Sequence, residues 1–595
     1  MGMNSTREPY AWVHRHSLVL GVAVVAACCA AAAAFLPVEY IANDDRAIVT
    51  ILKGSDGFPA DPGGIFINPV TSWLLYALYR VFPSVPFFGL LVYAVTNLAM
   101  ALIVGLFLRS NWIPAMLSLP VLALFVFTNS VFASFTAATL LMFLAVALCV
   151  GELMLGGGPP AGRKPYAALL CSCFFLAFLL RWDLVLIFIL AAAPWLLFLD
   201  RERLKDLAPA AAVTVVLAGL NYGVILLDRS HHAPFLAYNE LRSSFHDTYR
   251  GREHEGFTQG ALERAGWHFE EYYLFRKNWF VYDDVLFNAD TLATFLEHNN
   301  PKARAVALLG SMGERIRLSL RDNADQMIII ALCLGSVFLA TLPAMVRRTA
   351  RVNLRAAAAV LPVAALVGGL MAYRFPQRIS YPLFLYLYCF AFLLADGPGR
   401  AAEQRCGPTM RRVGLAAAFL VMACATAIAA KPVKLTAITL HNAAEKIRAN
   451  AATLSALAGA GGSSGKIVLP FDPVALSTIE DIHPFRENPA PSGLKIIPYG
   501  WVINTPHYAR ALQVMGVHSG RELLARIIDD DRVVLMQSLR PGDQVGAMEK
   551  ELLEMFLTFR IRPDRRIRLV PRFQTGDGYG GTIVFYGLQS LPRAG

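Results

Sequence analysis

Long apolar runs recur through the first 430 residues of this chain, and they restrict its possible folds more than any other feature. Runs long enough to cross about 30 Å of hydrocarbon occur near residues 17–37, 84–108, 111–128, 131–155, 166–180, 184–199, 207–227, 326–346, 354–371, 380–396 and 412–430. One long helix broken at Arg181, Trp182 and Asp183 is the alternative for the stretch 166–199, and the positions of the basic clusters favour two runs. The sequence therefore predicts an all-α polytopic membrane protein with about 11 transmembrane helices.

The composition supports a membrane protein. Hydrophobic residues make up 56% of the chain and charged residues only 16%, whereas soluble folds carry more charge. The formal net charge is +11, but Lys and Arg occur in short clusters between apolar runs, which argues against a nucleic-acid partner. None of the nine cysteines lies in a long polar region, so no disulfide framework or Cys zinc site is expected.

The basic clusters predict the topology. With a cytoplasmic N-terminus, the positive-inside tendency is satisfied when the clusters at 109, 163–164, 201–205, 347–355 and 400–412 are all cytoplasmic. This count requires the amphipathic stretch from Asn68 to Phe82 to lie along the outer interface rather than to cross. A cleaved signal peptide around 24–34 is the alternative to a retained first helix. It leaves the side of the membrane assigned to every later segment unchanged. Segments 38–83, 228–325 and 431–595 then share the outer compartment.

Residues 1–430 are expected to form the transmembrane module, and residues 431–595 an outer α/β domain. Its predicted strands are 466–470, 494–497, 532–536, 567–570 and 582–586, and its predicted helices are 507–514, 522–528 and 546–559. A capping box at Ser519 and Glu522 opens the second helix. No nucleophile elbow, P-loop or metal-spaced cluster occurs in it, and a solvated helix end explains Asp529 to Asp531 better than a cation site. We expect an accessory role, in acceptor binding or in shielding the site.

The large outer loop 228–325 is rich in aromatic and polar side chains. Tyr238, Asn239, Arg242 and Trp267 combine aromatic faces with hydrogen-bonding groups, which suits a sugar ring. A helical loop with its Trp and Tyr side chains at the lipid headgroups explains them equally well. The histidines of this loop lack the spacing of a zinc motif.

Two adjacent carboxylates, Asp44 and Asp45, follow the first apolar run at the outer boundary. One of them, with a slight preference for Asp44 because it is nearer the membrane, can act as a general base while the other orients a group or binds a cation. The alternative is an N-terminal cap of a short helix from Arg46 to Lys53.

Three arginines are also predicted on the outer side. Arg181 lies beside Asp183 between two apolar runs, and Arg374 and Arg378 precede the tenth run, against the positive-inside tendency. Guanidinium groups bind phosphate bidentately, so these residues are candidates for holding a polyprenyl phosphate. An interfacial turn at Arg181 and bulk lipid headgroups at the other two are the alternatives.

This order of elements resembles the GT-C superfamily of polyprenyl-phosphate-sugar-dependent membrane glycosyltransferases. In that superfamily the first span is followed by a catalytic acidic residue, an interfacial helix and the second span. Asp44 and Asp45, the stretch 68–82 and the run 84–108 occupy these places. The sequence Asn-Pro-Val-Thr-Ser-Trp-Leu-Leu from Asn68 is similar to the start of that helix in the lipid A aminosugar and protein mannosyl transferase group, although it lacks the Lys and one Pro. The resemblance covers residues 1–430.

The resemblance implies an inverting transfer of a sugar from a polyprenyl-phosphate donor to a hydroxyl of a glycan, lipid or protein, on the periplasmic face of a bacterial inner membrane. Asp44 or Asp45 is then the base, Arg181, Arg374 and Arg378 bind the donor phosphate, and the loop residues 238, 239, 242 and 267 with Asp183 contact sugar or acceptor. No cofactor is implied, and a divalent cation is optional. An O-antigen-type polymerase or ligase, a lipid or glycan transporter without transferase chemistry, and a non-catalytic scaffold are the alternatives. The sequence specifies neither the donor sugar nor the acceptor.

Overall fold

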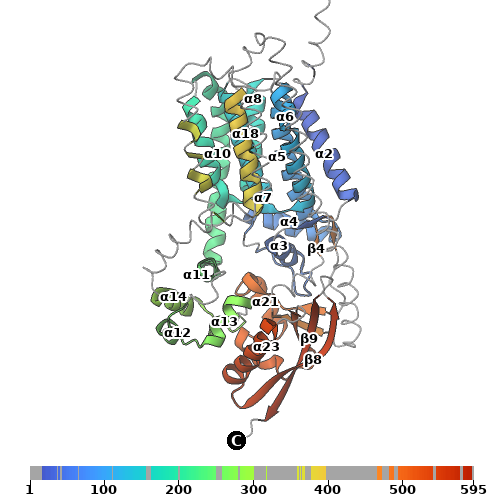
Figure 1. Ribbon diagram of the computed structural model, residues 1–595, viewed down its shortest axis with the longest axis vertical. Helices are drawn as coiled ribbons and strands as arrows, with labels where there is room; N and C mark the ends of the chain where they lie inside the picture. Colours follow the sequence, from blue (N-terminus) through green and yellow to red (C-terminus); the bar gives the residue numbers. More distant parts are fainter. Residues whose placement is uncertain are drawn as a thin grey trace, which may run out of the picture.

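The computed structural model describes two connected bodies, a bundle of apolar helices and an outer unit that contains a β-sheet (Figure 1). The described residues are 16–35, 38–40, 43–63, 66–109, 112–155, 162–198, 201–249, 257–278, 282–299, 358–368 apart from 361 and 364, 377–396, 466–471, 482–487, 494–539, 544–576 and 581–592, with positions 12, 317 and 331. The predicted runs 326–346 and 412–430 lie outside these ranges, apart from the single position 331, and so does Arg374, which was predicted to bind the donor phosphate.

The bundle is built from helices that run side by side (Figure 1). They are α2 (Ser17–Phe35), α5 (Phe87–Arg109), α6 (Trp112–Val131), α7 (Phe135–Met154), α8 (Arg163–Leu180), α10 (Arg201–His231) and α18 (Gln377–Asp396), with the short elements η1 (Trp182–Leu184), α9 (Val185–Ala192) and η2 (Ala193–Phe198) between α8 and α10. The end of α8 at Leu180 and the separate η1 confirm the predicted break at Arg181.

Four of the described helices are long and apolar enough to cross a membrane, namely Phe87–Arg109, Phe135–Met154, Arg163–Leu180 and Leu204–His231. Shorter apolar helical stretches occur at Ser17–Ala31, Val121–Val131, Trp182–Phe198, Ala358–Gly368 and Arg378–Leu394. The predicted count of about 11 spans is therefore not confirmed by the part of the chain that is described.

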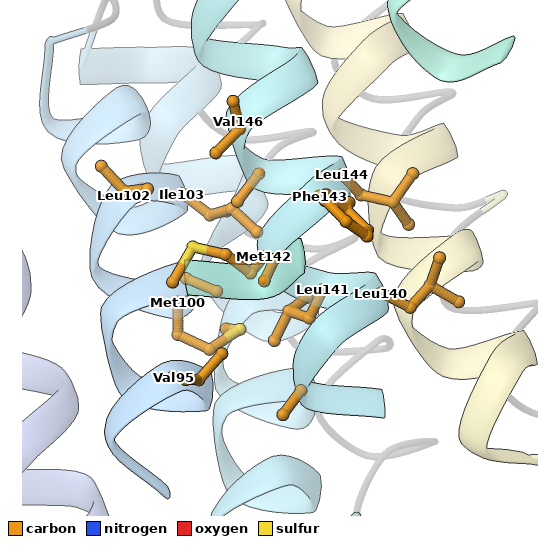
Figure 2. Packing of buried hydrophobic residues seen from close by; sticks show 14 of the residues in the cluster. Val95, Met100, Leu102, Ile103, Leu140, Leu141, Met142, Phe143, Leu144 and Val146 are labelled. Carbon is orange, nitrogen blue, oxygen red and sulfur yellow. The ribbon is translucent and has the colours of Figure 1, made fainter. Parts of the chain in front are cut away.

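Helix α7 forms the centre of the bundle because it is apolar on all sides. Its residue Met142 lies beside Met100 and Ile103 of α5, whereas Leu140 and Phe143 lie on the side of α7 away from α5, as Figure 2 shows, and all of these side chains are essentially excluded from solvent. The long helix α10 differs, since side chains such as Val215 and Leu220 remain 70% and 68% exposed. An apolar surface of this kind on a bundle helix requires a lipid environment or further apolar helices.

A buried ion pair joins the helices at one end of the bundle. Arg109 donates to both carboxylate oxygens of Glu152, at 2.9 and 2.6 Å, and also to the hydroxyls of Ser17 and Tyr166. Because α5 starts near α4 and runs away from it, this pair lies at the end of the bundle opposite the outer unit.

Two helices lie between the bundle and the outer unit (Figure 1). These are α3 (Asn43–Lys53) and α4 (Pro69–Val81), and α3 is preceded by β1 (Glu39–Tyr40), which pairs in parallel with β2 (Phe132–Ala133). On α4 the residues Val70, Trp73 and Leu74 are exposed, whereas the opposite face packs on the bundle. An amphipathic helix across the end of the bundle agrees with its predicted interfacial position.

The outer unit combines the large loop with the C-terminal residues. The loop contributes α11 (Ala233–Tyr249), α12 (Gln259–Ala265), α13 (Phe269–Asn278) and α14 (Ala289–His298). The C-terminal part contributes β3 (Lys466–Pro470), β4 (Ile482–His483), β5 (Arg486–Glu487), β6 (Leu494–Ile496), η6 (Gly500–Val502), α21 (Pro506–Val514), α22 (Gly520–Ile527), β7 (Val533–Leu539), α23 (Gln544–Phe556), the π-helical turn η7 (Leu557–Ile561), β8 (Arg565–Gly576) and β9 (Thr582–Pro592). The predicted strands and helices of this domain are confirmed to within a few residues at most ends, although β8 and β9 both extend six residues further at their C-terminal ends. The sheet order is β6-β3-β7-β9-β8, and β3 is parallel to its two neighbours.

One hydrophobic core spans the loop helices and the sheet. Trp267, Phe275 and Phe295 of the loop belong to the same buried cluster as Leu469 and Leu535 of the sheet. Polar contacts reinforce this junction, since the carboxylate of Asp284 accepts from two backbone N–H groups at the start of α22. The loop and the C-terminal domain therefore fold together as one unit.

Candidate active site

The acidic pair lies in the first turn of α3, at the end of the bundle that faces the outer unit. The helix begins at Asn43, three residues earlier than the predicted helix Arg46 to Lys53. Successive residues of a helix point in directions about a quarter-turn apart, so Asp44 and Asp45 face different neighbours. The structure gives the two carboxylates different partners and different exposure.

Asp45 is 0% exposed and is bound to the start of α7. Its Oδ1 accepts a hydrogen bond of 2.7 Å from the backbone N–H of Phe135, the first residue of that helix. A helix N-terminus favours a carboxylate at this position. Its Oδ2 is buried and has no hydrogen-bond partner among the described residues. Burial raises the pKa of Asp45 to about 7, opposed by the Phe135 N–H and reinforced by the charge of Asp44.

Asp44 faces the start of α18 and remains partly accessible. Its Oδ2 accepts a hydrogen bond of 2.8 Å from Nη1 of Arg378, and the two side chains are 23% and 20% exposed. Asp44 is thus the carboxylate that a substrate can reach, while Asp45 is enclosed by protein. The structure brings together three of the predicted site residues here, Asp44, Asp45 and Arg378.

Arg181 lies next to the same part of α7. Its guanidinium is 5.1 Å from the ring centroid of Phe135, whose backbone N–H binds Asp45, and its Nη1 donates to Thr136 at 2.6 Å. The remaining contacts of this guanidinium go to Asp183, at 2.9 and 3.0 Å. Phe135 therefore connects the acidic pair with Arg181. The side chain of Asp183 is 45% exposed.

The start of α4 holds the end of α8, from which Arg181 projects. The last carbonyls of a helix lack partners within it, and α4 supplies them from outside. Asn68 Nδ2 donates to the carbonyl of Phe178 at 3.3 Å, Thr71 Oγ1 to that of Leu179 at 2.6 Å, and the backbone N–H of Asn68 to that of Leu180 at 3.3 Å. The Asn-Pro-x-Thr sequence thus fixes the C-terminal end of α8, directly before Arg181.

Asn68 is itself held by a residue of α10. Its Nδ2 donates to Oδ1 of Asn221 at 2.7 Å, and both amides are buried. Sequence reasoning missed Asn221 and Thr136. A buried amide inside an otherwise apolar run was the available signal for Asn221. No signal in the sequence pointed to Thr136, because its role depends on where α7 begins.

The predicted sugar-contacting residues of the large loop lie in the outer unit. Trp267 is 1% exposed and donates from its ring nitrogen to the carbonyl of Leu286, so its surface is used in the shared core. Tyr238 is also buried there, and its hydroxyl has no hydrogen-bond partner among the described residues. Arg242 is largely buried and donates to Asn239 Oδ1 at 2.7 Å. Their burial gives Trp267 and Tyr238 a packing role.

One group of side chains in the described part of the chain has the composition of a metal site. His268, Glu270 and Glu271 place one ligand atom each within 4.8 Å of one another. Glu271 is already engaged, because one oxygen accepts from the backbone N–H of His268 and the other from Arg560 at 2.6 Å. We therefore assign this group to the junction between loop and C-terminal part.

Comparisons with known proteins give little independent information. No protein-family model matches the sequence, and no curated protein matches it. Among solved structures, the crystal structure of ArnT from Cupriavidus metallidurans in the apo state aligns with 95% of this chain and 97% of its own, at 12% identity and a TM-score of 0.34.

Proposed function

We propose that this chain is an inverting membrane glycosyltransferase of the GT-C type, which moves a sugar from a polyprenyl-phosphate donor to a hydroxyl acceptor at the outer face of the membrane. The observation that carries the proposal is the Asp44–Arg378 ion pair beside the buried Asp45, at the end of an apolar bundle. In this proposal a base and a phosphate-binding group are in contact, at the end of the bundle where a lipid-held phosphate would meet water.

Asp44 is the proposed general base. The acceptor hydroxyl oxygen forms a bond to the anomeric carbon while the bond from that carbon to the phosphate oxygen breaks. The phosphate leaves with the electron pair, and the hydroxyl proton passes to the carboxylate of Asp44. A side chain within hydrogen-bond reach of the hydroxyl contributes about 10²- to 10⁴-fold to such a step.

Arg378 is the proposed phosphate-binding residue. Asp44 engages the Nη1 of this guanidinium, so a phosphate can take other N–H groups of the fork. The bound phosphate would then share the positive charge of Arg378 with Asp44. The carboxylate of Asp44 would be less stabilised as an anion and would become a stronger base toward the acceptor. We also propose Arg181, which is paired with Asp183, as a second phosphate-binding residue, and the partly exposed Asp183 as a contact for a sugar hydroxyl. Arg374 remains a further candidate.

The buried Asp45 is proposed to position rather than to react. Its hydrogen bond with the N–H of Phe135 attaches α3 to α7. Arg181 contacts Phe135 and Thr136 in the same first turn of α7. Because two arginines can neutralise the phosphate, the proposal requires no metal ion.

Loss of the gene product tests the function most broadly. A deletion strain is expected to accumulate a polyprenyl-phosphate sugar, visible by mass spectrometry of extracted lipids, and the full-length chain should restore the wild-type level. A lipid profile that stays unchanged in the deletion strain would argue against a transferase. Accumulation of a lipid-linked glycan chain, in place of a single sugar, would favour a polymerase or ligase.

A further inference from the structure

The C-terminal part of the outer unit contacts the segment that carries the acidic pair. After α3 the chain continues through Asp56 to Asp61, and α21 packs against it. Asp56 Oδ2 lies 2.7 Å from Nε2 of His507, and both side chains are almost completely buried. Arg510, one turn further along α21, lies 3.4 Å from the carboxylate of Asp61.

The state of the buried His507 follows from its surroundings. Its Nδ1 has no hydrogen-bond partner among the described residues, so the proton is best placed on Nε2, where it is donated to Asp56, and Nδ1 is left as an acceptor. Asp56 then accepts from His507 at Oδ2 and from the backbone N–H of Phe58 at Oδ1, 3.2 Å away. Both oxygens of this carboxylate are engaged, which fixes the turn that ends α3.

Backbone and apolar contacts strengthen the same junction. The N–H of Ile496 in β6 donates to the carbonyl of Asp56 at 2.9 Å. Gly57 has a φ of +86°, and a Cβ there would come within 2.6 Å of the carbonyl oxygen of Leu494. The two segments of the backbone therefore meet without room for a side chain. Ile51 of α3 is buried in one cluster with Trp501 and Val502.

Helix α3 is therefore held at both ends. Its N-terminus is bound through Asp44 and Asp45 to α18 and α7, and its C-terminus is bound by the α/β part through Asp56. A short helix that is fixed in this way transmits a displacement of one end to the other, because the helical backbone is stiff.

We propose that His507 is a positioning residue for the acidic pair, so that the α/β part acts as a clamp that sets the place of Asp44. This inference depends on the proposed function, in which Asp44 is the base. A misplacement of about 1 Å caused far from the chemistry can lower a rate about 100-fold, so loss of the clamp should reduce turnover while donor binding at Arg378 is largely preserved.

The test uses the full-length protein in lipid nanodiscs. In His507→Leu, kcat for transfer from a polyprenyl-phosphate sugar should fall about 10- to 100-fold, with the donor KM within about twofold. His507→Gln, whose side-chain amide can place a donor where Nε2 lies, should recover most of the rate. The matched control is Arg532→Leu, which breaks an exposed ion pair to Asp530 on the same unit and should leave kcat unchanged.

Amide hydrogen exchange separates this inference from the proposed function. Residues 43–53 should exchange faster in His507→Leu than in wild type and in Arg532→Leu, whether or not transfer is detected. Unchanged exchange in α3, or equal loss of turnover in the two leucine variants, would overturn the clamp. If His507→Leu does not accumulate, Asp56→Asn provides the second variant, with a smaller effect expected in the same direction.

A double variant gives the most specific readout. If His507 acts through Asp44, adding His507→Leu to Asp44→Asn should lower the residual rate no further. Additive losses would show that the histidine supports the fold by another route, and the inference would be wrong.

Discussion

Arg378 Nη1 donates a hydrogen bond of 2.8 Å to Asp44 Oδ2, although the two residues are 334 positions apart in the chain. The contact joins the start of α3 to the start of α18, and it gives each residue a partner of opposite charge at the outer end of the bundle. A pair of this kind at a partly exposed position contributes little to stability. Its position therefore fits a role in binding better than a role in folding.

Replacing Arg378 with lysine tests the binding role. Lysine keeps the charge but lacks the planar fork, so the donor KM should rise about tenfold, equivalent to about 1.4 kcal/mol. Steady-state transfer in nanodiscs measures it, with Arg80→Lys on the exposed side of α4 as the control for headgroup interactions. Equal effects of the two substitutions would assign Arg378 to bulk lipid headgroups.

The raised pKa of Asp45 predicts a pH dependence of stability. The folded-state value of about 7 exceeds the usual value of about 4, so the folded protein binds this proton more tightly than the unfolded chain. The stabilisation is complete below pH about 4 and is lost as the pH rises through about 7. Asparagine mimics the protonated form, so the decrease in melting temperature from pH 5 to pH 8 should be smaller in Asp45→Asn. Identical decreases in both proteins would contradict the buried, proton-binding Asp45.

The contact of Thr71 with the end of α8 predicts an effect on Arg181. Thr71→Val removes the hydroxyl that binds the Leu179 carbonyl, which leaves a buried acceptor unsatisfied and costs about 1–3 kcal/mol. The donor KM should also rise, because Arg181 follows that turn. Thr214→Val, which removes a hydroxyl bonded within its own helix α10, should leave the KM unchanged. A KM effect of the same size in the control would contradict the positioning of Arg181 by α4.

The sequence predicted the parts of this structure that depend on local patterns. The apolar runs, the break at Arg181 and the capping box at Ser519 follow from residue spacing, and the Ser519 hydroxyl does accept from the N–H of Glu522 at 3.1 Å. The separate helix α4 also followed from the amphipathic pattern of this stretch, and its position at a membrane interface stays a prediction.

The contacts that define the site could not be predicted in this way. The sequence favours Asp44 only slightly over Asp45, and only the packing of α3 against α7 shows that Asp45 is enclosed while Asp44 is accessible. Trp267 is buried in a core that it shares with strands from Lys466 onward. The periodicity of the sequence around Trp267 does not reveal contacts with such distant residues. The placement of Arg374 and the total number of spans remain predictions.

The buried pair at the opposite end of the bundle gives a prediction about stability alone. Glu152→Ala leaves Arg109 buried without its carboxylate and should destabilise the protein by about 3–5 kcal/mol. Thermal unfolding in detergent measures the loss, and transfer per folded molecule should be unaffected because the pair is remote from Asp44. Asp530→Ala, which breaks an exposed pair, should cost less than about 1 kcal/mol. Similar losses in the two variants would show that the Arg109 pair is not enclosed as described.

The most direct measurement of the central claim is the transfer rate of Asp44→Asn compared with that of Asp45→Asn, with purified full-length protein and a polyprenyl-phosphate sugar. Asparagine keeps the shape of the side chain and removes the base, so Asp44→Asn should lower kcat about 100-fold or more with normal expression and an unchanged donor KM. Asp45→Asn should retain substantially more activity at pH 7, because the buried carboxylate is positioned by Phe135 and does not receive the proton. Near-full activity of Asp44→Asn would contradict the account.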